Sequence, residues 1–175
     1  NISYVENFLG NTPFHLVHLA MRQQGLMIVP GNGKGITGLG DLVRSDISFI
    51  NRQRGSGTRM LLDYELVKRD IDVKQISGYE TEVGTHMAVA ASIAAGTADT
   101  GLGVRAAAAA LGLDFIPIAE EQYDILLNFP EHDERLQAII DILQTAEFRQ
   151  EVEALGGYDL KNAGQIIVIN SQKNK

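Results

Sequence analysis

Short apolar segments alternate with helix-forming segments through the middle of the chain, and this alternation restricts the fold more than any other feature. The strand-like segments are 47–50, 76–80, 98–101 and 115–119, and the helical segments between them are 57–69, 85–95 and 105–111. Gly96 and Gly112 stop two of the helices, as glycine commonly does at a helix C-terminus. Strands that alternate with helices at this spacing indicate an α/β fold built on a mostly parallel sheet.

Segments on both sides of this region extend the pattern. We predict further strands over 14–21 and 26–29, which are separated at Gly25, and another over 123–129. Further helices are predicted over 38–44, 132–144 and 146–155. Residues 1–13 carry no clear period and are expected to be peripheral.

Composition excludes several classes of protein. The chain has 175 residues, 45% of them hydrophobic, which is enough for a packed globular core. Its net charge of −7 argues against direct contact with nucleic acid as the main role. The absence of cysteine excludes disulfides, thiolate metal sites and a cysteine nucleophile. No apolar run reaches the roughly 20 residues that span a bilayer, and no signal peptide is visible, so we expect no membrane contact.

A basic, glycine-rich loop follows the predicted strand 47–50 and runs directly into a helix. Its sequence is Asn51-Arg52-Gln53-Arg54-Gly55-Ser56-Gly57-Thr58-Arg59. The helix start offers backbone N–H groups at the positive end of the helix dipole, and the serine and threonine add hydroxyl donors. Arg52 and Arg54 would share one side of an ideal strand, where guanidinium groups can hold an oxyanion bidentately. We therefore predict a small-anion site formed by Asn51, Arg52, Arg54, Ser56, Gly57 and Thr58.

Simpler interpretations of this loop stay open. A glycine turn with a serine N-cap and surface arginines would have the same sequence. Thr85-His86 opens the next helix, and Thr85 is either a plain N-cap or a second hydroxyl directed at the same ligand. In open α/β sheets, ligands lie beyond the carboxyl ends of the strands, where these loops gather. We include Thr85 and His86 as candidate ligand contacts, although His86 is equally explained as a structural or exposed residue.

Two stretches imitate the fingerprint of a dinucleotide-binding fold. Gly33 to Gly38 fits G-x-G-x-x-G, but a short helix follows it and the next strand ends without an acid. Gly101 to Ala106 fits G-x-G-x-x-A and precedes an alanine-rich helix and a strand that ends in Glu120-Glu121. The segment 96–100 before it is poor in apolar residues, whereas a first Rossmann strand is a buried apolar run. An NAD-type enzyme domain that uses Gly101 to Glu121 therefore remains an alternative.

Signals for catalysis or metal binding are weak. The chain contains neither the G-x-S-x-G nucleophile elbow nor a Walker A sequence. His15 and His18 are three residues apart, which on a strand places them on opposite faces. Glu120, Glu121 and Asp124 are explained either by acid–base or metal chemistry or by a solvated strand edge. We predict no catalytic residue, no metal ligand and no cofactor.

The order of several segments resembles a known family. The segments are Met21 to Leu26, Pro30 to Asn32, Asn51 to Arg59, Gly78 to Glu80, Thr85-His86, Ala98 to Gly103, Leu113 to Pro117, Tyr123-Asp124 and Gly156 to Asp159. Together they resemble the periplasmic-binding-protein-like domain related to molybdate- and tungstate-binding proteins, over roughly residues 10 to 160. Asn51 to Arg59 is the most specific part of the match.

This resemblance implies a type II binding-protein architecture of two α/β lobes with a ligand cleft between them. It implies that residues 1–175 form one such domain, with a complete α/β lobe at 30–121. Residues 1–29 and 122–175 would be the crossing strands and helices of a partial other lobe. The N-terminal part of that lobe lies outside the match, and we expect the exposed apolar surface to favour homo-oligomers.

The resemblance also implies a function. The expected ligand is a tetrahedral oxyanion such as molybdate or tungstate, held by Arg52, Ser56 and Thr58. We expect a non-enzymatic sensor or carrier domain linked to molybdenum cofactor biosynthesis or its regulation. The expected partner is a fused or associated effector, either a molybdopterin-biosynthesis enzyme or a helix-turn-helix domain. The expected compartment is the cytoplasm, with the periplasm or the cell exterior as alternatives. A regulatory domain for another small anionic effector is a further alternative.

Overall fold

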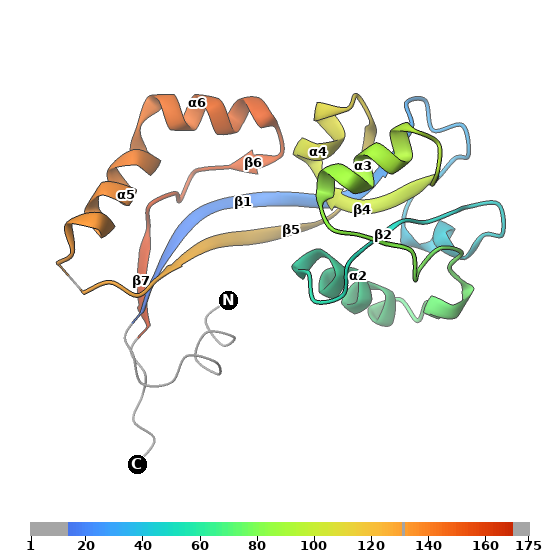
Figure 1. Ribbon diagram of the computed structural model, residues 1–175, viewed down its shortest axis with the longest axis horizontal. Coiled ribbons are helices and arrows are strands. Elements are labelled where there is room, and N and C mark those ends of the chain that lie inside the picture. The colour runs from blue at the N-terminus through green and yellow to red at the C-terminus, as the bar shows by residue number, and fades with distance from the viewer. Residues whose placement is uncertain (1–13, 131, 170–175) are drawn as a thin grey trace, which may run out of the picture. The chain divides into compact units, whose positions relative to one another are not determined.

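The structure, a computed structural model, describes residues 14–130 and 132–169. The expectation that residues 1–13 are peripheral therefore lies outside the described residues. The chain divides into two compact units, which we call the central unit (residues 23–120) and the terminal unit (residues 1–22 and 121–175). Two long strands, β1 (Phe14–Ile28) and β5 (Asp114–Leu127), contribute residues to both units (Figure 1).

The central unit combines short strands with helices. Its strands besides the ends of β1 and β5 are β2 (Asn51–Arg52), β3 (Glu82–Val83) and β4 (Thr100–Val104). Its α-helices are α2 (Gly57–Lys68), α3 (His86–Ala94) and α4 (Arg105–Ala110), and its 3-10 helices are η1 (Leu39–Val43) and η2 (Val73–Gln75). β2 and β3 pair in parallel, and a parallel bridge joins Phe49 to Thr100. β1 and β4 pair antiparallel, with Leu26 opposite Leu102.

The terminal unit contains two helices and two further strands. They are α5 (Glu134–Gln144), α6 (Ala146–Leu155), β6 (Tyr158–Asp159) and β7 (Ile166–Ile169). Both strands pair antiparallel with β1, with Met21 opposite Asp159 and Val17 opposite Ile166. In α5, Leu136, Ile140 and Leu143 recur at helical spacing and pack on Val17 of β1.

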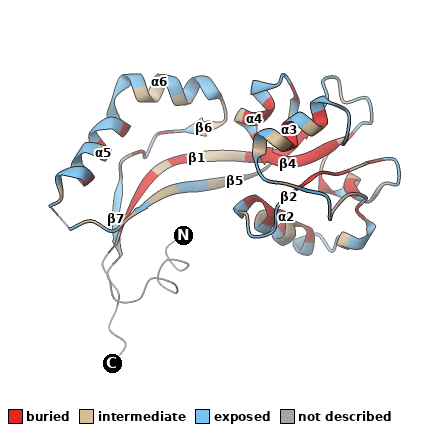
Figure 2. Cartoon of the chain, viewed as in Figure 1, coloured by how far each residue is buried: buried red, intermediate tan, exposed pale blue. Residues whose placement is uncertain are grey.

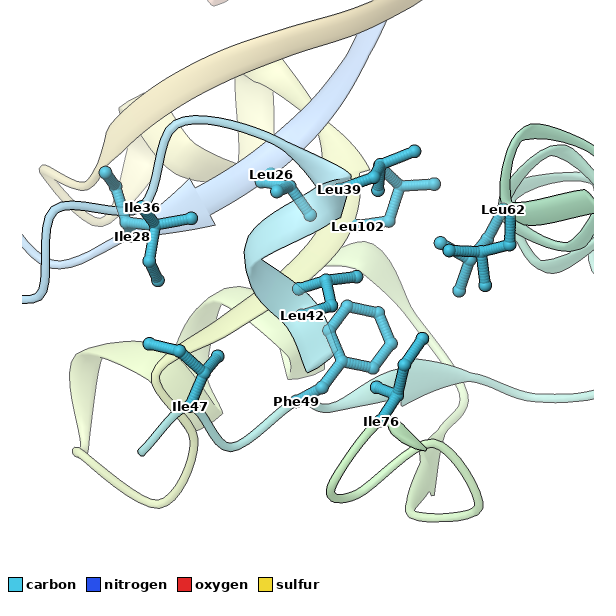
Figure 3. Packing of buried hydrophobic residues seen from close by; sticks show 11 residues of the cluster. Leu26, Ile28, Ile36, Leu39, Leu42, Ile47, Phe49, Leu62, Ile76 and Leu102 are labelled. Carbon is cyan, nitrogen blue, oxygen red and sulfur yellow. The ribbon is translucent and has the colours of Figure 1, made fainter. Parts of the chain in front are cut away.

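The core of the central unit lies on both faces of β1. Figure 2 shows buried residues along β4 and on the helices α2, α3 and α4. Leu26 faces a cluster that includes Leu62 of α2. Met27, the next residue, faces a second cluster that includes Val89 of α3 and Ala107 of α4. Since successive side chains of a strand point to opposite faces, this alternation places α2 on one face and α3 and α4 on the other. Figure 3 shows Leu42, Phe49 and Ile76 close together in the first cluster.

The α/β class is confirmed, and so are most of the predicted helices. Helices were predicted over 57–69, 105–111 and 146–155, and α2, α4 and α6 match these ranges to within one residue. The antiparallel pairing of β1 with β4, β6 and β7 was not visible in the strand–helix alternation. No helix in the described part of the chain combines the length and the apolar character that a bilayer crossing needs.

The long strands contradict two predicted breaks. β1 continues through Gly25, where the sequence predicted an interruption. Gly25 lies where β1 and β5 come close, because a Cβ there would overlap the carbonyl oxygen of Ile116 and lie 2.7 Å from the Phe115 ring. The glycine therefore permits close strand packing and does not end the strand. β5 is likewise one strand, where two were predicted at 115–119 and 123–129.

Three short strands lie a few residues from their predicted positions. The segment 47–50 is buried, but the strand β2 begins at Asn51. The predicted strand 76–80 is wrong, because β3 begins only at Glu82. The predicted strand 98–101 corresponds to β4 at Thr100–Val104. An apolar run in the sequence indicates that a segment is buried. Whether its backbone pairs as a strand depends on a neighbouring strand, which the sequence does not reveal.

The start of α5 carries a specific dependence on pH. Asp133 is the N-cap of α5, and its pKa is lowered from 3.8 to about 2 because the side chain and the backbone amide of Arg135 donate to its carboxylate. A lowered pKa in the folded state stabilises the helix above the ordinary pKa of the group, and this contribution is lost as the carboxylate is protonated. We expect the α-carbon NMR shifts of α5 to move towards coil values between roughly pH 4 and pH 2.

The matched control is Asp133→Asn. Asparagine still offers an oxygen acceptor to the first turn but does not titrate. The variant should therefore lose this part of the pH response while it retains the helix at neutral pH. An unchanged acid transition in the variant would assign the response to another carboxylate.

Candidate functional site

Two helices of the central unit begin at the same end of a parallel pair of strands. Asn51 of β2 lies opposite Glu82 of β3, and Arg52 lies opposite Val83. β2 leads through a short turn into α2, and β3 leads through Gly84 and Thr85 into α3. Because parallel strands end on the same side, the N-termini of both helices lie at the carboxyl edge of this strand pair. The predicted site residues are brought together here.

The start of α2 leaves backbone donors available. Ser56 is the N-cap, and its hydroxyl accepts the Arg59 amide at 3.2 Å. The first backbone bond of the helix runs from Met60 N to Ser56 O at 3.0 Å. The amides of Gly57 and Thr58 precede this bond, and neither meets a protein acceptor within residues 14–130 and 132–169. Gly57 is exposed, whereas Thr58 is buried, so an incoming anion has access at Gly57.

The start of α3 has the same construction. Thr85 is the N-cap, and its hydroxyl accepts the Ala88 amide at 3.0 Å. The first backbone bond of the helix runs from Val89 N to Thr85 O. Thr85 is exposed and His86 is half-buried at the first position of the helix. The plain-cap interpretation of Thr85 is therefore correct for its hydroxyl, and the helix start remains at the shared edge.

Arg52 connects the two loops. The residue is 8% exposed, and its Nη2 donates to the carbonyl oxygen of Gly84 at 3.0 Å. Its Nε donates to the side-chain oxygen of Gln53 at 3.2 Å. Both of these acceptors are neutral groups, and the two bonds orient the guanidinium. A buried, oriented cation therefore lies between the strand ends that precede α2 and α3.

Asn51 and Arg54 make structural contacts within the protein and are not directed at a ligand in this arrangement. The Asn51 side chain is fully buried and bonds to the Tyr79 carbonyl and the Arg52 amide, so it fixes the loop. Arg54 is exposed, and its pKa is raised because its guanidinium donates to Glu80 at 2.6 Å and lies near Glu82. The prediction that Arg52 and Arg54 share one strand face is wrong, because β2 ends at Arg52 and Arg54 lies in the following turn.

Arg59 is a structural member of this loop that the sequence did not distinguish. It is 4% exposed and forms ion pairs with Asp63 at 3.1 Å and Glu82 at 3.0 Å. Its guanidinium also lies over the Tyr79 ring, 4.1 Å from the centroid. These contacts attach the first turn of α2 to β3. The spacing of Arg59 and Asp63, one helical turn apart, was the available signal.

The structure does not support the dinucleotide alternative. Gly101 and Gly103 lie within β4, opposite Met27 and Gly25, and not in a turn before a helix. A Cβ at Gly101 would lie 2.5 Å from a Val89 methyl and 2.6 Å from the Ile50 carbonyl oxygen. These glycines therefore allow α3 and the neighbouring strand to approach β4, and they form no phosphate-binding turn. Over residues 14–130 and 132–169, no cluster of three histidine or acidic side chains is placed to hold a metal ion.

Two relatives share clear sequence identity with the chain. YvgK from Bacillus subtilis (strain 168), described as uncharacterized, is 38% identical over 168 residues, which are 96% of this chain and 54% of YvgK. A Clostridium pasteurianum protein described by its position in the 5′ region of the ferredoxin 2Fe-2S gene is 34% identical over 110 residues. That match covers 62% of this chain and 97% of the relative. The chain thus spans about half the length of YvgK.

Solved structures share the fold at low sequence identity. L-phospholactate-bound PEB3 aligns over 82% of this chain and 67% of its own, with a TM-score of 0.60 and 15% identity. The substrate binding domain described as part of a molybdenum ABC transporter from Clostridium difficile aligns over 82% of this chain and 66% of its own, with a TM-score of 0.59 and 13% identity. Residues 1–144 match the family described as the PBP superfamily domain. The chain therefore belongs to the PBP superfamily.

Proposed function

We propose that the chain is a non-enzymatic domain that binds a tetrahedral oxyanion, with molybdate or tungstate as the ligand. Membership of the PBP superfamily supports the binding of a small ligand. The finer assignment depends on one observation, the start of two helices at one edge of the β2–β3 pair beside the buried Arg52 guanidinium. Helix N-termini are well suited to anions because their amides and dipoles converge on one point.

The charge of this arrangement suits a dianion held mainly by neutral donors. The amides of Gly57 and Thr58 supply hydrogen bonds without charge, and Arg52 supplies one buried positive charge. Arg54 is paired with Glu80 at the surface and therefore contributes little net charge. Oriented amide dipoles in a region of reduced solvent can stabilise an anion without a full set of counter-charges.

Two different neighbours are relevant to the identity of the anion. The neighbour from Clostridium difficile is described as part of a molybdenum transporter, which supports molybdate. PEB3 is described with L-phospholactate bound, which supports a small phosphorylated acid as a second candidate. Both ligands present a tetrahedral group of oxygen atoms, and two helix starts with an arginine can bind either one. Titration with both classes distinguishes them.

The biological setting is also a proposal. We infer a cytoplasmic role in molybdenum cofactor biosynthesis or its regulation, together with a fused or associated effector domain. The chain spans about half of YvgK, which leaves room in the relative for further protein. Disruption of the gene should lower the activity of molybdenum-dependent enzymes when molybdate is scarce. Unchanged enzyme activity at limiting molybdate would contradict this role.

Replacement of Gly57 tests whether its backbone N–H donates a hydrogen bond to the anion. Proline at the first helical position is compatible with the helix, and Ser56 already has the extended backbone (ψ 144°) that precedes proline well. Gly57→Pro replaces the amide hydrogen that should face the anion with a ring carbon. We expect the affinity for molybdate to fall at least about tenfold in calorimetric titration, because one charge-assisted hydrogen bond is lost.

The matched control is Gly57→Ala, which retains the N–H. It should bind the oxyanion as the unchanged chain does, and both variants should retain similar melting temperatures without ligand. Equal affinities in the proline and alanine variants would show that this amide does not contact the anion. Titrations with tungstate, phosphate and a phosphorylated hydroxy acid establish which anion the site prefers.

A further inference from the structure

The terminal unit contains a polar hollow that is separate from the helix starts. Its volume is about 250 Å³, and His18 of β1 and Asp124 of β5 line it. Asn162 and Gln165 add amide groups, and Leu16 and Ile167 are among its apolar walls. None of these residues belongs to the loops before α2 and α3, so the proposed oxyanion site does not account for the hollow.

The histidine of this hollow has an unused nitrogen. His18 is 8% exposed, and its Nδ1 lies 2.8 Å from a carboxylate oxygen of Asp124. Its Nε2 is buried, and within the described part of the chain it has no hydrogen-bond partner. A buried polar atom without a partner is destabilising, so such atoms are uncommon unless a ligand or water satisfies them.

The aspartate defines what Nε2 can bind. Asp124 has a side chain that is 2% exposed, and Gln122 Nε2 also donates to its two oxygens at 3.1 and 3.0 Å. A carboxylate acceptor beside Nδ1 favours the tautomer with its proton on that nitrogen, which leaves the lone pair of the ring on Nε2. The free nitrogen is therefore a hydrogen-bond acceptor with a buried negative charge behind the ring.

Other uses of the pair are less consistent with these surroundings. A transition metal would need further ligands, and no third histidine or acidic side chain joins this pair among the residues described. Serine, threonine and cysteine are absent from the described residues that line the hollow, so it offers no nucleophile for a histidine base to activate. Binding is the function that remains.

We propose that this hollow binds a small molecule that ends in a primary ammonium group. One N–H of the ammonium donates to His18 Nε2, and the carboxylate behind the ring favours its positive charge. The apolar part of the ligand lies against Leu16, Ile166 and Ile167. A volume of about 250 Å³ exceeds the roughly 30 Å³ of one water several-fold, which suits a molecule of a few non-hydrogen atoms.

Histidine NMR on the full chain tests this site directly. With ¹⁵N-labelled histidine, the Nε2 resonance of His18 should move and saturate on addition of n-butylammonium at constant neutral pH and ionic strength. n-Butanol, which has a donor without charge, should bind more weakly, and butyrate should not bind. No saturable change with n-butylammonium, or a stronger response to butyrate, would overturn the proposal. A stronger response to butanol would also overturn the ammonium assignment.

Two variants separate the site from general effects. Asp124→Asn retains an oxygen that can accept the Nδ1 proton, so we expect n-butylammonium to bind at least about tenfold more weakly while butanol binding is unchanged. His132→Gln replaces an exposed histidine and should leave binding unaltered. Equal ammonium affinity in Asp124→Asn and the unchanged chain would contradict the role of the charge. His18→Phe should abolish binding, and the His18 resonance of the unchanged chain remains decisive if that variant does not fold.

Discussion

Gly78→Ala is expected to lower the free energy of unfolding by more than about 4 kcal/mol, the range in which single substitutions become exceptional. Gly78 has φ +89°, and a Cβ there would overlap the carbonyl oxygen of Phe49. Phe49 cannot move easily, because the residue is 2% exposed in the core and its amide donates to Ser77 O at 2.8 Å. The contact is with backbone, so a rotamer change cannot relieve it. The same shift would displace β2 from β3 and weaken oxyanion binding.

Gly31→Ala is the matched control for this substitution. Gly31 also has a positive φ, +81°, but a Cβ there meets nothing within 4 Å. Its cost should be only that of the backbone conformation, about 1–2 kcal/mol. Chemical denaturation of both variants gives the comparison. Similar losses at the two positions would show that the region around Phe49 adjusts to a methyl group.

Arg52→Met is expected to weaken molybdate binding by at least about 100-fold, which corresponds to about 2.7 kcal/mol. Methionine retains the apolar length of the side chain but removes its charge and its donors. The carbonyl of Gly84 then loses its bond from Nη2, so the variant should also lose about 1.5–3 kcal/mol of stability. Calorimetric titration below the melting range of the variant separates lost binding from lost folding.

Arg54→Met removes the same charge two residues later in the chain. Because Arg54 is exposed and paired with Glu80, its loss should change stability by less than about 0.5 kcal/mol. The molybdate affinity should change by less than about threefold, since exposed charges are screened by salt. If both variants lose affinity equally, the arginines act through the long-range field and not by contact. If Arg52→Met binds normally while folded, the oxyanion does not contact Arg52.

The two proposed sites differ in how far the sequence predicted them. The loop from Asn51 to Thr58 was visible because glycine, hydroxyl and arginine residues stand together before a helix. The pair of His18 and Asp124 was not visible, because these residues lie far apart in the sequence and β1 and β5 bring them within 2.8 Å. The spacing of His15 and His18 indicated only that the two side chains do not bind one metal ion together. The tertiary structure places the carboxylate of Asp124 beside His18.

The errors in the strands have a common cause. Gly25 was treated as a break, and two strands were predicted on either side of residues 120–122, yet β1 and β5 run through these positions. Close packing against Ile116 explains the glycine, which no sequence pattern could have shown. The apolar segment 47–50 was correctly predicted to be buried, but the backbone pairs in the parallel ladder only from Asn51. Burial follows from composition, whereas register follows from the partner strand.

The sequence by itself determined the helix boundaries at the proposed oxyanion site, because Ser56 and Thr85 each cap a helix through hydrogen bonds that reach only three residues along the chain. Only the tertiary structure decided that these two caps are neighbours. The parallel pairing of Arg52 with Val83 and the bond from Arg52 to Gly84 bring the two helix starts to one edge. Such contacts join residues that are far apart in the sequence, and closing the loop between them has a cost in conformational entropy. Their free energy also depends on how α2, α3 and β1 pack around them, and a local sequence pattern does not specify this packing.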